Sequence, residues 1–324
     1  MLSLNKNKVI TLLIISIVIL LGIGIYKHKK RNNYYKQLIS KLESICNPIC
    51  PSGVLPCPAA YCNTDLLNLN SNFKGVLIKD KNNLNILLKA KDDVSNYIAD
   101  TLEWEPHLQN ALRQIIKPRD KVLVLGAHIG IHAVLISKLA NEGQISIFEA
   151  NPYVLKFLET NLVLNNITNA KLYPKAAFSE NTTVSFLAKD TGNTGASHIK
   201  RLDTAQKEEL ITVDAVNIDS IKDIQTIDIL QMDIEGAEEN AVYGAQKLID
   251  RSPNLIVFQE WSPFWMKDID TYLKFWRSRN YKIVQITLSG GLKELTDEAL
   301  KSSGQIDIVM TKNLEKLINN FKPL

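Results

Sequence analysis

The stretch that most constrains this chain is the run from Lys121 to His132, which reads KVLVLGAHIGIH. Four apolar residues, 122–125, lead directly into Gly126, and Gly130 opens a segment whose apolar residues have helical spacing. A continuous apolar run is typical of a strand buried on both faces of a parallel sheet. Glycines permit a sharp turn and the close approach of a ligand to the N–H groups at a helix start. The same pattern also occurs for packing alone, so by itself it does not decide a function.

An acidic residue at the end of the next predicted strand indicates which kind of ligand the glycine turn could bind. The apolar run Ile145 to Phe148 ends in Glu149, 23 residues after Gly126. A carboxylate at this place can accept both hydroxyls of a ribose, although an acid that charges a helix start would look the same. The sequence contains neither G-x-G-x-x-G nor G-x-x-x-x-G-K-[ST], so no cradle for a di- or triphosphate is indicated. The pair of features predicts a nucleoside site whose cofactor is still open.

The rest of the chain after residue 68 alternates strands with helices. Strands are predicted at 121–125, 144–149, 171–175, 227–232, 255–258, 282–287 and 306–311, with helices at 131–141, 151–165 and about 266–279. This alternation predicts a mostly parallel, doubly wound α/β sheet. A hairpin (75–78 and 84–89) and a mostly helical segment (92–117) precede it. A polar loop at 190–206 separates two further strands, 182–187 and 210–216, and long ordered loops are usually functional.

The N-terminal segment reads as a membrane anchor. Val9 to Ile25 is 17 residues without a charge, which as a helix spans about 26 Å, just enough for a bilayer core. No good small-x-small cleavage site follows it, so an uncleaved anchor with basic flanks is predicted over residues 1–31. The basic residues after the apolar run outnumber those before it, which predicts a cytosolic globular part.

All four cysteines lie in a Pro-rich linker, residues 32–67, at positions 46, 50, 57 and 62. Their spacing lacks the C-x2-C pairs of common zinc modules. Two disulfides would suit an oxidising compartment, whereas reduced cysteines would suit the cytosol. Reduced thiols, disulfides and a zinc site therefore all remain open.

The net charge of +4 comes entirely from the N-terminal region. Eight of the 38 basic residues lie in residues 1–41, which contain no acid, so residues 42–324 carry 30 basic against 34 acidic side chains. A mildly acidic globular part argues against a nucleic-acid partner.

Several motifs together resemble the FkbM-type methyltransferases, over roughly Trp104 to Met310. They are, in order, Gly126-Ala-His-Ile-Gly130, Phe148-Glu149 with Asn151-Pro152, Ile218-Asp219, Asp233-Ile-Glu-Gly-Ala-Glu238, Gly244-Ala245 and Glu260. The resemblance implies an S-adenosylmethionine-dependent O-methyltransferase with a Rossmann-like, seven-stranded sheet whose last strand, 306–311, is antiparallel. The domain would span 68–324, with an N-terminal cap (68–117) and a core (118–324). Its acceptor would be a hydroxyl of a sugar, glycan or other small metabolite.

The resemblance also implies the site residues. The cofactor would be bound by Gly126, Ala127, His128, Gly130, Glu149 and Asp233, and the catalytic residues would be Asp233, Glu235 and Glu260. If the strand continued past 232, Asp233 and Glu235 would face the same way, and Glu260 ends the next strand. Three such carboxylates could share a proton or hold Mg²⁺, although no metal is predicted. Acids at a helix start are the alternative explanation for Glu235 and Glu238.

Other residues are ambiguous. His128 and His132 could each act as a base, although most such histidines only pack or lie at the surface. Trp261 and Trp265 could wall a pocket, although aromatics in this position are usually core. The departures Val124, Arg119 and Gln231, where the family usually has an acid, a glycine and a lysine, favour a second hypothesis of a degenerate, membrane-tethered binding module. A third hypothesis is a nicotinamide oxidoreductase, but this sequence lacks the third glycine that such an enzyme would need.

Overall fold

The computed structural model describes residues 67–70, 73–200 and 210–322. The anchor predicted at 9–25 and the four cysteines lie outside the described residues. Within them, no helix combines the length and apolar character needed to cross a membrane. Residues 64–324 form one compact unit.

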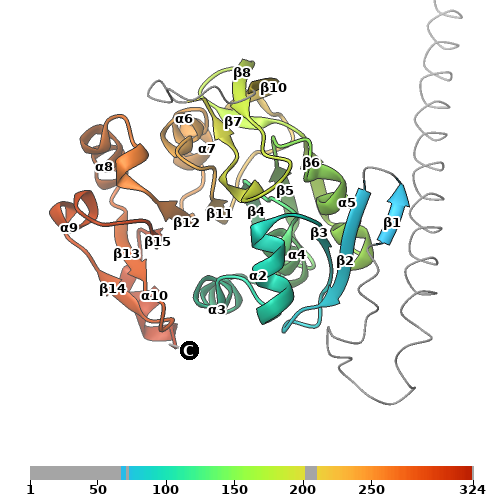
Figure 1. Cartoon of the computed structure of the whole chain (residues 1–324). Helices are drawn as coiled ribbons and strands as arrows, with labels where there is room; N and C mark the ends of the chain where they lie inside the picture. Colours follow the sequence, from blue (N-terminus) through green and yellow to red (C-terminus); the bar gives the residue numbers. More distant parts are fainter. Residues whose placement is uncertain (1–66, 71–72, 201–209, 323–324) are drawn as a thin grey trace, which may run out of the picture. The chain divides into compact units, whose positions relative to one another are not determined.

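The centre of this unit is an eight-stranded mixed sheet (Figure 1). Its order is β14 (Leu292–Glu294), β13 (Lys282–Ile286), β15 (Ile306–Thr311), β12 (Ile256–Trp261), β11 (Ile229–Met232), β4 (Lys121–Leu125), β5 (Gln144–Phe148) and β6 (Ala170–Tyr173). The strands from β12 to β6 are parallel, and β15 is antiparallel to both of its neighbours, as predicted. The expectation of seven strands is wrong by one. The additional strand, β14, has three residues, too few for a readable apolar pattern.

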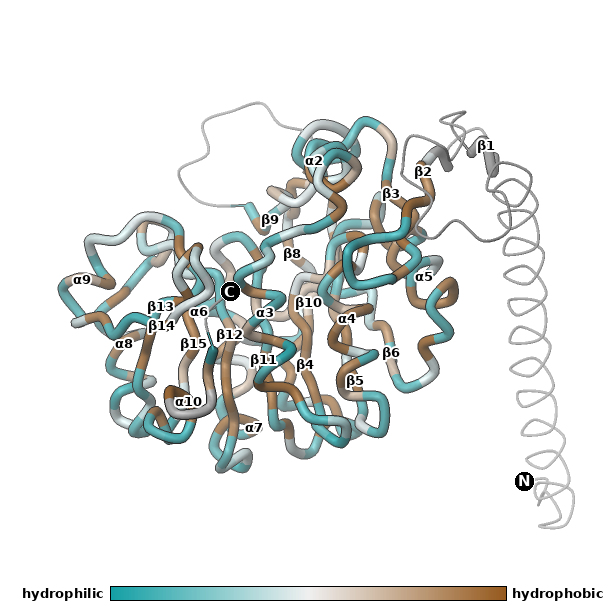
Figure 2. Tube along the Cα trace, turned by 90° about the horizontal axis from the view of Figure 1, so that it is seen from below, coloured by the Kyte–Doolittle hydropathy of each residue, from teal (hydrophilic) through white to brown (hydrophobic). Residues whose placement is uncertain are grey.

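Helices cover both faces of this sheet, so the doubly wound prediction is confirmed. Leu123 and Leu125 of β4 join a core cluster with side chains of α6 (Glu238–Tyr243), α7 (Gln246–Asp250) and α8 (Ile269–Arg277). Successive side chains of a strand point to opposite faces, so Val122 and Val124 point to the other face, on the side of α3 (Pro106–Ile115) and α4 (Ile131–Leu139). These four apolar side chains of β4 are at most 1% exposed. In Figure 2 the central strands are accordingly brown, and much of the teal lies in turns and outer helices.

The helical segment expected at 92–117 is broken into α2 (Asp93–Thr101) and α3. The break occurs because Leu102 and Glu105 take left-handed backbone conformations, with φ of 59° and 46°. Pro106 has no backbone N–H to donate and would clash with the preceding turn inside a helix, so it stands at the first position of α3. This break places Trp104 and Glu105 beside the cavity described below.

Two smaller sheets flank the main one. The predicted hairpin is present as β2 (Phe73–Lys79) and β3 (Asn85–Lys89), with β1 (Leu67–Asn70) as a third antiparallel strand. The other sheet has the order β7 (Ala176–Phe178), β10 (Leu210–Asn217), β8 (Thr182–Leu187), β9 (His198–Ile199). The described part of the predicted polar loop contains a 3-10 turn, Thr194–Ala196, and strand β9. The remaining helices are α5 (Leu155–Leu164), which contacts β3, α9 (Asp297–Lys301) and α10 (Leu314–Asn320).

Candidate functional site

A cavity of about 570 Å³ lies at the carboxyl ends of strands β4, β5, β11 and β12. This is where open α/β sheets bind ligands, and the volume is in the usual range for small-molecule sites. Residues from the segment before α3, from the loop after β8 and from the start of β15 also line it.

The glycine turn after β4 forms one side of the cavity. Gly126 has a φ of +79°, and a Cβ atom there would lie 1.7 Å from the carbonyl oxygen of Asp233. Glycine is therefore required because the turn passes directly against the end of β11. Gly126 and His128 line the cavity, whereas Ala127 and Gly130 do not. Gly130 instead precedes α4 with a φ of +96° and packs against Leu158.

Glu149 lines the cavity and also holds the glycine turn together. Its Oε2 accepts hydrogen bonds from the backbone N–H groups of Ala127 (3.1 Å) and His128 (2.7 Å), and its Oε1 accepts one from Asn151 (2.7 Å). An ionised carboxylate has about four acceptor positions, so these bonds use most of its capacity. Burial raises the pKa of Glu149, and the backbone N–H groups oppose that rise. The sequence predicted a ribose acceptor and did not reveal this second role.

The three carboxylates predicted to be catalytic do converge. Asp233, Glu235 and Glu260 can each place an oxygen within 4.8 Å of the others, and all three line the cavity. The expected reason was wrong, because β11 ends at Met232 and does not continue through Glu235. Left-handed conformations at Glu235 (φ 54°) and Gly236 (φ 93°) turn the chain instead. Carboxylates at this spacing could hold a divalent cation or share protons.

The electrostatics of this group favour shared protons. Burial, followed by the neighbouring Glu260, raises the pKa of Asp233 well above its ordinary value. Burial, followed by the charge of Glu235, raises the pKa of Glu260 to about 8. Gln305 donates a hydrogen bond to Glu260 and opposes that rise. Like charges this close cannot all ionise near neutral pH, so the group retains protons there.

Four further ionisable residues line the cavity and were not predicted: Glu105, His107, Lys175 and Asp307. His107 Nε2 lies 2.6 Å from Asp307 Oδ2, and this hydrogen bond raises the pKa of His107. Asp307 is also the cross-strand partner of Glu260. The predicted antiparallel direction of 306–311 contained the signal for Asp307, because it brings the first residues of that strand to the carboxyl ends of the others. Nothing in the local pattern around 105–107 indicated that the cap would reach the same place.

The histidines and tryptophans whose roles the sequence left open differ in whether they line the cavity. His128 Nε2 lies 2.6 Å from Thr194 Oγ1, inside the cavity lining. His132 Nε2 lies 2.9 Å from Glu105 Oε2, and His132 does not line the cavity. Trp261 is fully buried in the core, where its Nε1 donates to the Leu300 carbonyl (3.0 Å). Trp265 is also absent from the cavity lining, whereas Trp104 is part of it.

The three departures from the family pattern lie away from the cavity lining. Val124 and Gln231 are buried in neighbouring strands, β4 and β11, where they are paired in register. Arg119 is on the surface and pairs with Glu142 at 2.9 Å. None of them removes a side chain from the wall of the cavity.

Comparison with known proteins agrees with the motifs. Residues 125–283 match the family model described as the Methyltransferase FkbM domain. No curated protein matches the sequence.

Among solved structures, the chain is similar to a precorrin-6y C5,15-methyltransferase from Geobacter metallireducens, with 12% identity, 64% of this chain and 87% of that chain covered, and a TM-score of 0.36. An rRNA methylase from Streptococcus thermophilus has 11% identity, coverage of 65% and 97%, and a TM-score of 0.36. TYW2 of M. jannaschii in complex with AdoMet has 12% identity, coverage of 75% and 86%, and a TM-score of 0.37. The resemblance expected from the motifs is thus confirmed, because residues 125–283 match the model of the FkbM methyltransferase domain.

Proposed function

We propose that the protein transfers a methyl group from S-adenosylmethionine to a hydroxyl oxygen of a sugar, glycan or other small metabolite. The observation that carries this proposal is that one cavity joins the glycine turn and Glu149 to the carboxylates Asp233, Glu235 and Glu260. The glycine turn and Glu149 suit the binding of a nucleoside, and the three carboxylates suit proton transfer. Both lie at the ends of adjacent strands, as a cofactor and its acceptor require.

The residues around the glycine turn fit a nucleoside cofactor. Gly126 and Glu149 both line the cavity. When bound, S-adenosylmethionine supplies a methyl group on a cationic sulfonium. A cavity wall rich in carboxylates favours a cationic ligand, because the ligand offsets their mutual repulsion.

The carboxylates provide the proton acceptor. Methyl transfer to a hydroxyl needs alignment of the oxygen with the methyl group and removal of the hydroxyl proton. A base is most effective when its pKa lies near the working pH, and the pKa of Glu260 is raised to about 8. We assign the role of proton acceptor to the group formed by Asp233, Glu235 and Glu260, whose carboxylates share the hydroxyl proton. The chemistry assigned to this group requires no metal ion, although the oxygens could also hold one.

The charges of the cavity support a small acceptor over a nucleic acid. Its wall contains the carboxyl groups of Glu105, Asp233, Glu235, Glu260 and Asp307, and those that are ionised oppose a phosphate backbone. The lining includes one lysine, Lys175, and its Nζ lies 3.1 Å from Asp214.

The test of this proposal is calorimetric titration of the full chain, in a mild detergent, with S-adenosylmethionine and S-adenosylhomocysteine. We expect dissociation constants on the order of micromolar for both, and a loss of binding in Glu149→Ala. Glu142→Ala is the matched control, since that carboxylate is exposed and pairs with Arg119 on the surface. A folded protein that binds neither ligand would instead favour the degenerate binding module. Once binding is established, transfer of labelled methyl to a panel of hydroxylated sugars tests the reaction.

We also propose that residues 9–25 anchor the enzyme and that its domain faces the cytosol. The uncharged apolar run and the basic residues that follow it support this arrangement. Release of the protein by alkaline extraction of membranes would contradict the anchor.

A further inference from the structure

The loop between β8 and β9, residues 188–197 and here called the wall loop, forms one side of the cavity. Asn193, Thr194 and Ser197 line the cavity together with His128 and Glu149. The proposed reaction assigns no task to these three side chains. Their place beside the carboxylate expected to meet the ribose suggests one.

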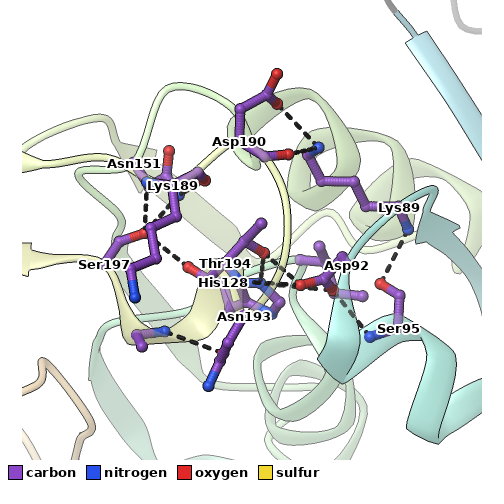
Figure 3. A network of polar contacts seen from close by, with 12 residues as sticks. Lys89, Asp92, Ser95, His128, Asn151, Lys189, Asp190, Asn193, Thr194 and Ser197 are labelled. Carbon is purple, nitrogen blue, oxygen red and sulfur yellow. Dashed lines mark hydrogen bonds and ion pairs between the residues drawn. The ribbon is translucent and has the colours of Figure 1, made fainter. Parts of the chain in front are cut away.

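A chain of hydrogen bonds locks the wall loop to the glycine turn (Figure 3). Thr194 donates through its backbone N–H (3.1 Å) and its hydroxyl (2.7 Å) to Oδ1 of Asp92, which precedes α2. The oxygen of the same hydroxyl, Thr194 Oγ1, also lies 2.6 Å from His128 Nε2. Both Asp92 and Thr194 are at most 1% exposed.

The donors in this chain follow from counting protons. The Thr194 hydroxyl has one proton, which goes to Asp92, so its oxygen must accept from His128 Nε2–H. His128 is then the neutral Nε2–H tautomer, with Nδ1 as an acceptor. Burial lowers the pKa of His128 to about 4, which agrees with a neutral ring. Burial alone would raise the pKa of Asp92, but His128 and the bonds from Ser95 and Thr194 outweigh it and lower that pKa.

A second attachment involves Asn151. Its side chain Nδ2 donates to the Lys189 carbonyl (3.1 Å) and to Ser197 Oγ (2.9 Å), at the two ends of the wall loop. His128 and Asn151 are also two of the residues whose backbone N–H groups bind Glu149. The same two residues therefore hold Glu149 with their backbones and the wall loop with their side chains.

We propose that the wall loop is the wall against which the nucleoside of the cofactor binds, and that Asp92 and Thr194 are positioning residues that hold the loop and the His128 ring in place. The proposal rests on the proposed function, because it takes the ligand beside Glu149 to be a nucleoside. Capping of α2 alone does not explain the lock. Asp92 caps the helix through Oδ2, which accepts from Ser95 N at 2.8 Å, and that bond requires neither Thr194 nor His128.

The test compares S-adenosylhomocysteine binding by the full chain and by Thr194→Val. Valine keeps the shape but leaves His128 Nε2–H without its partner in a buried place. It also removes one of the two hydrogen bonds that Thr194 donates to Asp92 Oδ1 and keeps the one from the backbone N–H. We expect the dissociation constant to rise at least about tenfold, mainly through faster dissociation, and Thr194→Ser to restore it to within about threefold.

Thr160→Val is the matched control. Thr160 is another buried threonine whose hydroxyl donates one bond (2.7 Å, to the Lys156 carbonyl), and it does not line the cavity. If the wild type binds and Thr194→Val binds as tightly as Thr160→Val, the inference is overturned while the proposed function stands. If the wild type does not bind at all, both fail.

Nitrogen-15 spectra of the histidine rings provide a readout that does not require Thr194→Val to fold. We expect wild-type His128 to be the Nε2–H tautomer at neutral pH, and its ring nitrogens to shift when S-adenosylhomocysteine is added. An Nδ1–H tautomer, or spectra unchanged by the ligand, would overturn the inference.

Discussion

Replacement of Glu260 by glutamine should stabilise the folded protein relative to the wild type, by an amount that grows as the pH rises from 5 to 8. Glu260 lies with Asp233 and Glu235 in one carboxylate group, and burial followed by repulsion from Glu235 raises its pKa from 4.5 to about 8. The folded protein therefore binds this proton more tightly than the unfolded chain does. Its contribution to stability is fully present below about pH 4.5 and is lost as the pH rises toward 8. Glutamine has a similar shape and cannot ionise.

The magnitude follows from that pKa. Where the unfolded chain is ionised and the folded protein is not, stability falls by about 1.4 kcal/mol for each pH unit. Between pH 5 and pH 8 the wild type should lose about 3 kcal/mol that Glu260→Gln keeps. For a domain of this size, that difference corresponds to about 10 °C in Tm. Loss of Glu260 also removes the largest charge acting on Asp233, which changes stability in the same direction.

The assay is thermal and urea unfolding of both proteins at several pH values, with a chelator present because a divalent cation would stabilise the ionised carboxylates. The pH dependence of the difference is the decisive quantity, since it cancels changes in packing. Glu142→Gln, at an exposed position, should show a constant difference. A difference for Glu260→Gln that stays flat from pH 5 to pH 8 would refute the reasoning that the group retains protons at neutral pH.

Two further predictions concern the same site. Gly126→Ala should cost more than about 3 kcal/mol or prevent folding, because its Cβ would lie 1.7 Å from the Asp233 carbonyl oxygen, whereas Gly304→Ala meets nothing within 4 Å and should be nearly neutral. Urea unfolding measures both, and equal effects would contradict the close approach. Asp307→Asn should lower the pKa of His107, because the hydrogen bond to Asp307 is the main cause of its rise. The native stability that protonated His107 contributes at low pH would then be lost at a lower pH. An NMR titration that finds the His107 pKa unchanged would show that the pair does not form.

The sequence predicted the main sheet well because each strand is encoded locally. The runs at 121–125 and 306–311 match β4 and β15 residue for residue. A strand buried on both faces needs apolar side chains at every position, and that pattern is visible without any partner. Short strands such as β7 and β14 were missed because three residues have no measurable period.

For the candidate site, the sequence was sufficient where function follows the end of a strand. Gly126, Glu149, Asp233 and Glu260 each follow or end an apolar run, so their meeting at one edge of the sheet could be expected. The expectation that Asp233 and Glu235 converge was right, but for a reason that the structure does not support, because the turn at Glu235 and Gly236 brings them together.

By itself, then, the sequence determined the α/β architecture, the glycine turn and the acids at the strand ends, because these depend on short-range patterns of apolar residues and glycine. Tertiary structure alone decided that His107 reaches Asp307, 200 positions away, and that Asp92 meets Thr194, 102 positions away. It also decided that Glu149 holds the backbone of the glycine turn. These contacts join segments that no local pattern relates, and they form only when the cap and the wall loop pack against the edge of the sheet.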